Sequence, residues 1–278
     1  MTLNVPLRAA SRVVAVAIGL GCAGARADDA SPWVGDRHSE VRLVAGSRSG
    51  TVLLGGVAIR LEPGWKTYWR TPGDSGVPPR FDFSKSENVE AVTVLWPAPG
   101  KFDDGAGGIA YGYRKQVLLP LRIVTRNADK PVILRAAISY AVCEKICLPV
   151  EASLELPFAN VVSMEDAALS AALDTVPKPA NIGDPNPVTL LDVHREGASR
   201  VVVDVAEPQG TPVDLFVEGP TPDWALPPPQ PVAHETRGVK RFAFELEGLP
   251  SGVKPDGAAL KFTVTGGGKA YEFNVNLD

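Results

Sequence analysis

The sequence predicts an all-β protein of two domains, each built as a sandwich or a barrel. Short runs of alternating apolar and polar residues recur along the chain, and turn-forming residues separate them. The chain also holds 26 prolines and 27 glycines, which favour frequent turns over long helices. Its 278 residues exceed the usual size of a single hydrophobic core, so we expect two domains of ordinary size.

The first segment, residues 1–27, is typical of an export signal that is removed after translocation. Its apolar run is shorter than the roughly 20 residues that span a bilayer. We therefore expect a mature chain in the periplasm, with no stable membrane insertion. The features that predict the signal are the basic Arg8 and Arg12, the apolar residues 13–21, and the small residues Ala25 and Ala27 before a cleavage site at Asp28.

Six runs in the first half have the alternation of strands and predict a domain over residues 28–160. Proline- and glycine-containing turns separate several of them, which is the spacing of a sandwich or a barrel. The expected strands are residues 40–44, 51–61, 89–96, 117–124, 132–142 and 151–156, and the turns are residues 62–64, 72–76, 97–100 and 126–129.

A short helix and a proline-rich linker are expected over residues 161–187. Alanine and leucine recur at three- and four-residue steps within residues 163–176, and Ser163 with Asp166 resembles a capping box. Pro177 and Pro179 end the helix. The four prolines within residues 177–187 then predict a linker between the domains.

The remaining residues, 188–278, have the same strand-like style as the first half. Residues 260–265 and 269–277 form the clearest predicted hairpin, because apolar residues alternate on both sides of three consecutive glycines. The other expected strands are residues 188–193, 200–205, 213–217 and 241–246.

Charge and motifs exclude several classes of function. Removal of the signal takes three arginines and leaves 25 basic against 32 acidic residues, a net charge of about −7. This balance argues against nucleic acid or an anionic membrane as the main partner. The three histidines are scattered and none adjoins a cysteine in sequence, and no glycine-rich phosphate loop precedes a helix. The sequence therefore predicts no bound cofactor.

Two cysteines, Cys143 and Cys147, are the only ones outside the signal, which holds Cys22. On an extended strand, residues four apart lie about 13 Å apart, whereas a disulfide needs Cα atoms within about 4.4–6.8 Å. A bond between them therefore requires a turn, and strand-like residues flank the pair on both sides. The pair is thus expected at the tip of a hairpin, where another protein can reach it.

Three roles for this pair follow from the sequence. A redox role is favoured, because a disulfide that closes a loop of only five residues removes little entropy from the unfolded chain. It would stabilise the folded protein by only about 2 kcal/mol. A structural disulfide in a non-catalytic binding module is the second interpretation. A copper(I) site is the third, although two thiolates alone make an incomplete site. No helix start lowers the thiol pKa here, and a thiol of ordinary pKa suits an electron donor better than a strong oxidant.

Further motifs give the chain a resemblance to a known family. It resembles the periplasmic N-terminal (alpha) region of the DsbD/ScsB thiol:disulfide interchange proteins, nearer to the ScsB-like branch. The second half resembles, more loosely, a further immunoglobulin-like module of ScsB-like proteins. The matching stretches, in the family's order, are Gly64-Trp-Lys-Thr-Tyr-Trp69, Pro72-Gly-Asp-Ser-Gly-Val-Pro78, Trp96-Pro-Ala-Pro99, Tyr111-Gly-Tyr113 and Val142-Cys-Glu-Lys-Ile-Cys-Leu-Pro149.

The resemblance implies two tandem immunoglobulin-like β-sandwich domains, the first of which carries a redox pair. It implies that a membrane thiol reductase reduces the pair, and that the dithiol then reduces a periplasmic thioredoxin-like protein. In this scheme Cys147 attacks the target disulfide and Cys143 resolves the mixed disulfide. This chain has no transmembrane or thioredoxin segment of its own, so the membrane reductase is expected on a separate chain.

The resemblance also suggests residues near the cysteines. In the DsbD branch a loop caps the pair, and the corresponding stretch here is residues 102–111. The cysteine spacing is shorter than in that branch, and glycines fill the stretch, so the cap is an open question. The expected near-site residues are Asp103, Asp104 and Tyr111 from this stretch, with Tyr140 and Pro149 from the cysteine run.

Overall fold

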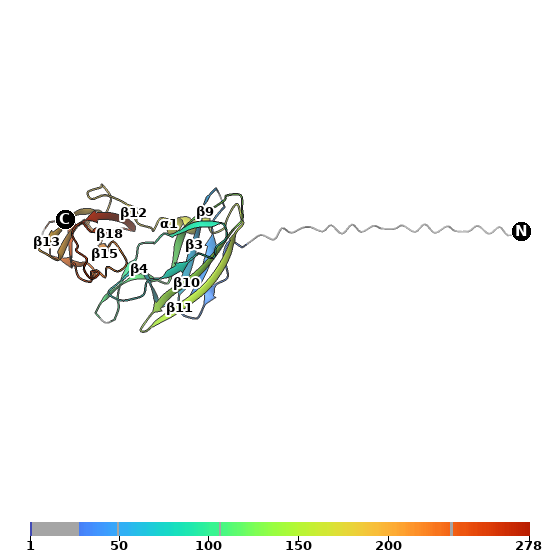
Figure 1. Ribbon diagram of the computed structural model, residues 1–278, viewed down its shortest axis with the longest axis horizontal. Helices are drawn as coiled ribbons and strands as arrows, with labels where there is room; N and C mark the ends of the chain where they lie inside the picture. The colour runs from blue at the N-terminus through green and yellow to red at the C-terminus, as the bar shows by residue number, and fades with distance from the viewer. Residues whose placement is uncertain (2–27, 49, 106, 234–235) are drawn as a thin grey trace.

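The computed structural model describes residues 1, 28–48, 50–105, 107–233 and 236–278 (Figure 1). Residues 2–27 of the expected signal, residues 1–27, lie outside the described residues. The regular structure of the described part is almost entirely β-strand, with one α-helix, so the predicted all-β class is confirmed. None of the helical segments in these ranges is long and apolar enough to cross a membrane.

The first half of the described chain folds into two antiparallel sheets that enclose one core. The first sheet has the order β1-β2-β3-β9-β6, and the second has the order β11-β10-β4-β8-β7, with β5 paired to β10. The strands are β1 (Val34–Gly35), β2 (Ser39–Ala45), β3 (Val52–Leu61), β4 (Lys66–Gly73), β5 (Arg80–Asp82), β6 (Val89–Val94), β7 (Gly100–Asp103), β8 (Ile109–Arg114), β9 (Gln116–Thr125), β10 (Val132–Cys143) and β11 (Cys147–Phe158).

Alternation of side chains along these strands builds the core between the two sheets. Leu43 and Val57 come from the first sheet, and Leu134, Ile138 and Trp69 come from the second; each is at most 2% exposed. Because successive residues of a strand point to opposite faces, the neighbours of these residues lie on the outer faces. For the second sheet, this outer face carries the cysteines.

The second half forms another pair of sheets around a separate core. Figure 1 shows it as a second body beside the first, with its strands in orange and red. The clearest predicted hairpin is confirmed as β18 and β19, joined at Gly267 and Gly268, both of positive φ. The strands are β12 (Lys178–Pro179), β13 (Leu190–Glu196), β14 (Arg200–Ala206), β15 (Val213–Glu218), β16 (Gln230–Val232), β17 (Val239–Glu245), β18 (Ala259–Gly266) and β19 (Lys269–Asn276).

We call the two pairs of sheets, each with its own core, the first and the second domain. The helix α1 (Asp166–Leu173) packs on the first domain, against β3 and β9, rather than standing free between the two. Leu169 is fully buried, and the carboxylate of Asp166 accepts a hydrogen bond from the backbone N–H of Ser47 at 2.7 Å. The helix begins after Glu165 without a side-chain cap, so the expected capping box is not formed. The hydroxyl of Ser163 instead accepts a hydrogen bond from the backbone N–H of Glu165 at 3.0 Å and donates one to the carbonyl of Ala45 at 2.6 Å.

The expected linker is also partly structured. Lys178 and Pro179 form β12, which pairs in parallel with β19 of the second domain. The backbone N–H of Ala98 in the first domain donates to the carbonyl of Thr175 at 2.9 Å. Each end of the connection is therefore tied to a different domain, and only a few residues join them.

Four tyrosines should make the protein sensitive to alkali. Burial raises the pKa of Tyr68, Tyr111, Tyr113 and Tyr140 above the ordinary value of 10.0. A raised folded-state pKa means that the unfolded chain loses these protons first. The stabilisation is therefore fully present below about pH 10 and is lost as the pH rises further, by up to about 1.4 kcal/mol per pH unit for each tyrosine.

We expect denaturant titrations at increasing pH to show a steep loss of unfolding free energy that begins near pH 10. Tyrosinate absorbance should rise together with unfolding. Ionisation of all the tyrosines while the circular dichroism of the folded protein persists would contradict this burial argument.

Candidate redox site

The two cysteines face each other across the tip of the β10–β11 hairpin. The register of the two strands pairs Cys143 directly with Cys147, and the two sulfurs form a disulfide with an S–S distance of 2.00 Å. The three residues between them make the turn, and the backbone N–H of Glu144 donates to the carbonyl of Ile146 at 3.3 Å. The turn predicted from the cysteine spacing is therefore present.

The two cysteines differ sharply in exposure. Cys143 is buried, with 2% of its surface exposed, whereas Cys147 is exposed. The adjacent Ile146 is 66% exposed. A thiolate of another protein that approaches the tip therefore meets Cys147, and Cys143 is left as the departing sulfur. This asymmetry is the geometric basis for assigning different chemical roles to the two residues.

Tyr68 is the side chain that contacts the disulfide from β4. Its hydroxyl donates a hydrogen bond to Sγ of Cys143 at 2.8 Å and lies 3.4 Å from Sγ of Cys147. Tyr68 has the opposite orientation to the core residue Trp69, so it lies on the outer face of the sheet. There it forms a small buried cluster with Ala110, Ala141 and Cys143.

The phenol of Tyr68 is neutral under physiological conditions. Burial raises its pKa above 10.0, and the negative charge of Asp104 raises it further. A neutral phenol is a hydrogen-bond donor, and sulfur accepts such a bond more strongly as a thiolate than as part of a disulfide. Tyr68 is therefore placed to stabilise the negative charge that develops on Cys143 when the disulfide opens.

A loop from the predicted motif of residues 72–78 holds the ring of Tyr68. Gly76 adopts a φ of +120°, and a Cβ atom there would lie 2.3 Å from the ring. Only glycine combines this backbone conformation with so close an approach. The motif thus has a local physical role, which is to cover the tyrosine on the outer face of the sheet.

The stretch expected as a cap loop, residues 102–111, is mostly a hairpin of β7 and β8. The carbonyl of Asp103 accepts a hydrogen bond from Nζ of Lys66 at 3.2 Å, and Lys66 is the register partner of Cys143 on β4. Asp104 accepts a hydrogen bond from the backbone of Gly108 at 2.9 Å, and its charge acts on Tyr68. Both aspartates therefore lie close to the site: Asp103 is the last residue of β7 and Asp104 follows it directly.

The other three expected near-site residues are placed differently. Tyr111 packs edge-on against Phe216 of the second domain, with ring centroids 4.8 Å apart, so its ring lies on the core side rather than at the disulfide. Tyr140 also points into the core, where its hydroxyl bonds that of Ser39 at 3.0 Å. Pro149 is exposed on β11, two residues beyond Cys147, and pairs with Ala141. Proline fits there because β11 ends its sheet.

Comparison with known proteins agrees with this geometry. The family described as "Thiol:disulfide interchange protein DsbD, N-terminal" matches residues 41–159. This stretch, less than half of the 278 residues, is similar to the N-terminal domain of DsbD. No curated protein sequence matches the chain.

The solved structures add information on the fold. The N-terminal periplasmic domain of ScsB from Proteus mirabilis superposes with a TM-score of 0.72 at 23% identity, covering 90% of this chain and 98% of that one. A conserved domain protein from Bacillus anthracis aligns over 84% of this chain and 75% of its own, at 9% identity, but its TM-score of 0.23 is too low to indicate a shared fold.

The similarity to the DsbD N-terminal family and the disulfide between one buried and one exposed cysteine support thiol–disulfide interchange as the general chemistry. Bond exchange requires a thiolate to reach one sulfur of a disulfide and a second sulfur to leave. At the hairpin tip, the exposed Cys147 provides the sulfur that a thiolate can reach, and the buried Cys143 provides the sulfur that leaves.

Burial predicts unequal reactivity of the two thiols in the reduced protein. With limiting iodoacetamide, Cys147 should be alkylated at least about tenfold faster than Cys143, because exposure controls access to a thiol. Peptide mapping by mass spectrometry measures the ratio, and the same protein in denaturant, where both thiols are accessible, is the control. Equal rates in the folded protein would remove the basis for separate roles.

Proposed function

We propose that this chain is a periplasmic thiol–disulfide interchange protein that passes electrons from a membrane thiol reductase to a thioredoxin-like periplasmic protein. The observation that carries the proposal is the disulfide at a hairpin tip, with Cys147 exposed and Cys143 buried. The export signal predicted from the sequence supports the compartment, as does the similarity to a protein described as a periplasmic domain.

Electron delivery takes two exchange steps. In the reduced protein the Cys147 thiolate attacks one sulfur of the partner's disulfide, and the partner's other sulfur leaves as a thiolate. The Cys143 thiolate then attacks Sγ of Cys147 in the mixed disulfide and releases the partner's second thiolate. The partner gains two electrons and becomes a dithiol, while this chain ends with the Cys143–Cys147 disulfide.

Recharging is the reverse sequence with a different partner. A thiolate of the membrane reductase attacks the exposed Cys147, and Cys143 leaves as a thiolate. Tyr68 donates its hydrogen bond to that departing sulfur, so the group that must stabilise charge has a donor already in place at 2.8 Å. A second thiolate of the reductase then attacks the reductase sulfur of the mixed disulfide, and Cys147 leaves as a thiolate.

The geometry favours this role over a structural disulfide. Cys143 and Cys147 are already neighbours in an antiparallel ladder that continues along both strands, so the bond ties together residues that the hairpin holds in place. Its contribution through the unfolded state is only about 2 kcal/mol for so short a loop. A staple of distant strands would stabilise the sandwich more.

Trapping of a mixed disulfide tests the proposal. Cys143→Ala leaves the exposed thiol without its resolving partner and should accumulate a covalent complex with a periplasmic thioredoxin-like protein. Cys147→Ala is the matched control, and it should trap little or nothing, because the remaining thiol is buried. Non-reducing electrophoresis and mass spectrometry of periplasmic extracts identify the complex.

Two results would count against the relay. Failure of both variants to capture a thioredoxin-like protein would leave a binding module with a fixed disulfide. Stoichiometric copper(I) uptake by the reduced protein, lost in either cysteine variant, would instead assign the pair to metal binding.

A further inference from the structure

The strand that carries Tyr68 is only partly held by its own sheet. β4 pairs with β10 at Lys66 and Thr67, and with β8 from Lys66 to Tyr68. The register with β8 is then interrupted until Gly73. The regular ladder therefore ends at the residue that contacts the disulfide, and the following residues take their support from elsewhere.

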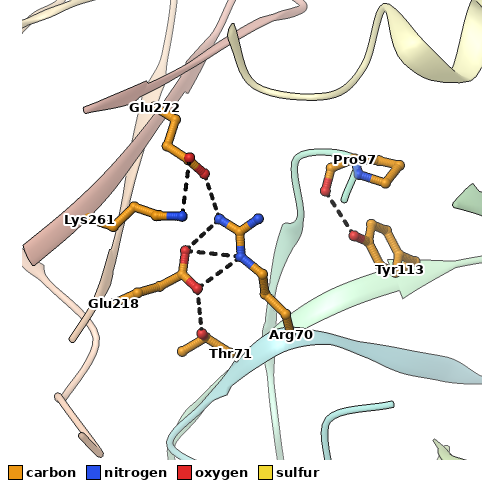
Figure 2. Close-up of polar contacts among 7 residues, drawn as sticks. All are labelled: Arg70, Thr71, Pro97, Tyr113, Glu218, Lys261 and Glu272. Atoms are coloured by element: carbon orange, nitrogen blue, oxygen red, sulfur yellow. Dashed lines mark hydrogen bonds and ion pairs between the residues drawn. The ribbon is translucent and has the colours of Figure 1, made fainter. Parts of the chain in front are cut away.

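That support comes from the second domain. Figure 2 shows Arg70 held between Glu218 of β15 and Glu272 of β19. Nε of Arg70 lies 2.9 Å from Oε1 of Glu218, and one Nη lies 2.6 Å from Oε2 of each glutamate. Thr71 donates a further hydrogen bond to Glu218 at 2.8 Å, and Lys261 pairs with Glu272 at 3.3 Å.

An apolar contact accompanies the ion pairs. Phe216 of the second domain is fully buried and belongs to the core cluster of the first domain. Its ring lies 5.8 Å from that of Trp69 and 4.8 Å from that of Tyr111, both in edge-on geometry. Three consecutive residues after Tyr68 are thus fixed by contacts that the second domain provides, entirely or in part.

We infer that the second domain is a positioning element for the redox pair. By holding Trp69, Arg70 and Thr71, it fixes the irregular part of β4 and keeps the hydroxyl of Tyr68 on Sγ of Cys143. Arg70 acts through Tyr68 and does not itself touch either sulfur. This inference deepens the proposed function, and it rests on Cys143 and Cys147 being a redox-active pair.

The expected effect has a definite direction. A thiolate of Cys143 accepts the hydrogen bond of Tyr68 more strongly than a disulfide sulfur does, so the bond stabilises the reduced form. Tyr68→Phe should therefore shift the equilibrium with glutathione toward the disulfide by about tenfold, equal to about 30 mV for a two-electron couple. A looser β4 should give a smaller shift in the same direction.

The test is the glutathione equilibrium constant of the whole mature chain in four variants. We expect about a threefold shift toward the disulfide in Arg70→Gln, and no further shift when Arg70→Gln is added to Tyr68→Phe, because the same hydrogen bond is already gone. Arg241→Gln is the matched control. It also removes a bidentate arginine–carboxylate pair, with Asp204 at 2.6 Å, but within one sheet of the second domain, and it should leave the equilibrium unchanged.

Two outcomes would overturn the inference: an unchanged equilibrium in Arg70→Gln, or a shift that persists in full in the Tyr68→Phe background. If Arg70→Gln fails to fold by circular dichroism, Glu218→Gln, which leaves the first domain's sequence intact, decides by the same criteria. The equilibrium requires no protein partner. A chain that captures no thioredoxin-like protein can therefore still show this coupling, and the relay can hold without it.

Discussion

The register of the β10–β11 hairpin is the constraint on which the rest of the site depends. It places Cys143 opposite Cys147 and gives both a position at the tip of the sheet. Because side chains alternate with a period of two, a slip of one residue would turn Cys143 toward the core and away from Tyr68. The core residues Tyr140 and Val142 fix the register, since the same slip would expose them to solvent. Packing in the sandwich thus determines which sulfur is shielded and which can be reached.

β4 links this tip to the rest of the molecule, because its two faces serve different purposes. Trp69 points into the core and meets Phe216, while Tyr68 points outward to the disulfide. The arginine that follows binds two glutamates of the second domain. A short stretch of one strand therefore contacts the redox pair, the core and the neighbouring domain. Such an arrangement gives the second domain a physical path to the chemistry, although Arg70 itself touches neither sulfur.

Much of the fold followed from local pattern, and the part that did not is non-local. The strands around residues 117–124 and 132–142, the last hairpin and the turn between the cysteines were predicted from alternation and turn residues, and the structure confirms them. Tyr68 was predicted only as part of the family-like stretch Gly64–Trp69, with no role assigned to it. Alternation separates it from Trp69, but no local signal shows that β4 lies beside β10, some 75 residues along the chain. The position of Tyr111 depended on Phe216, a residue of the other domain. Of the stretch that the resemblance suggested as a cap, residues 102–103 and 109–111 belong to the β7–β8 hairpin, which the local pattern did not predict.

The redox state of the cysteine pair in living cells tests most directly whether Cys143 and Cys147 are a redox-active pair. Acid quenching followed by alkylation with a mass-labelled maleimide separates chains with the disulfide from chains with two thiols. A relay protein should show a measurable reduced fraction that disappears when the membrane reductase is deleted. A pair that is fully oxidised in every molecule, with or without the reductase, would contradict it and leave the disulfide as a structural link.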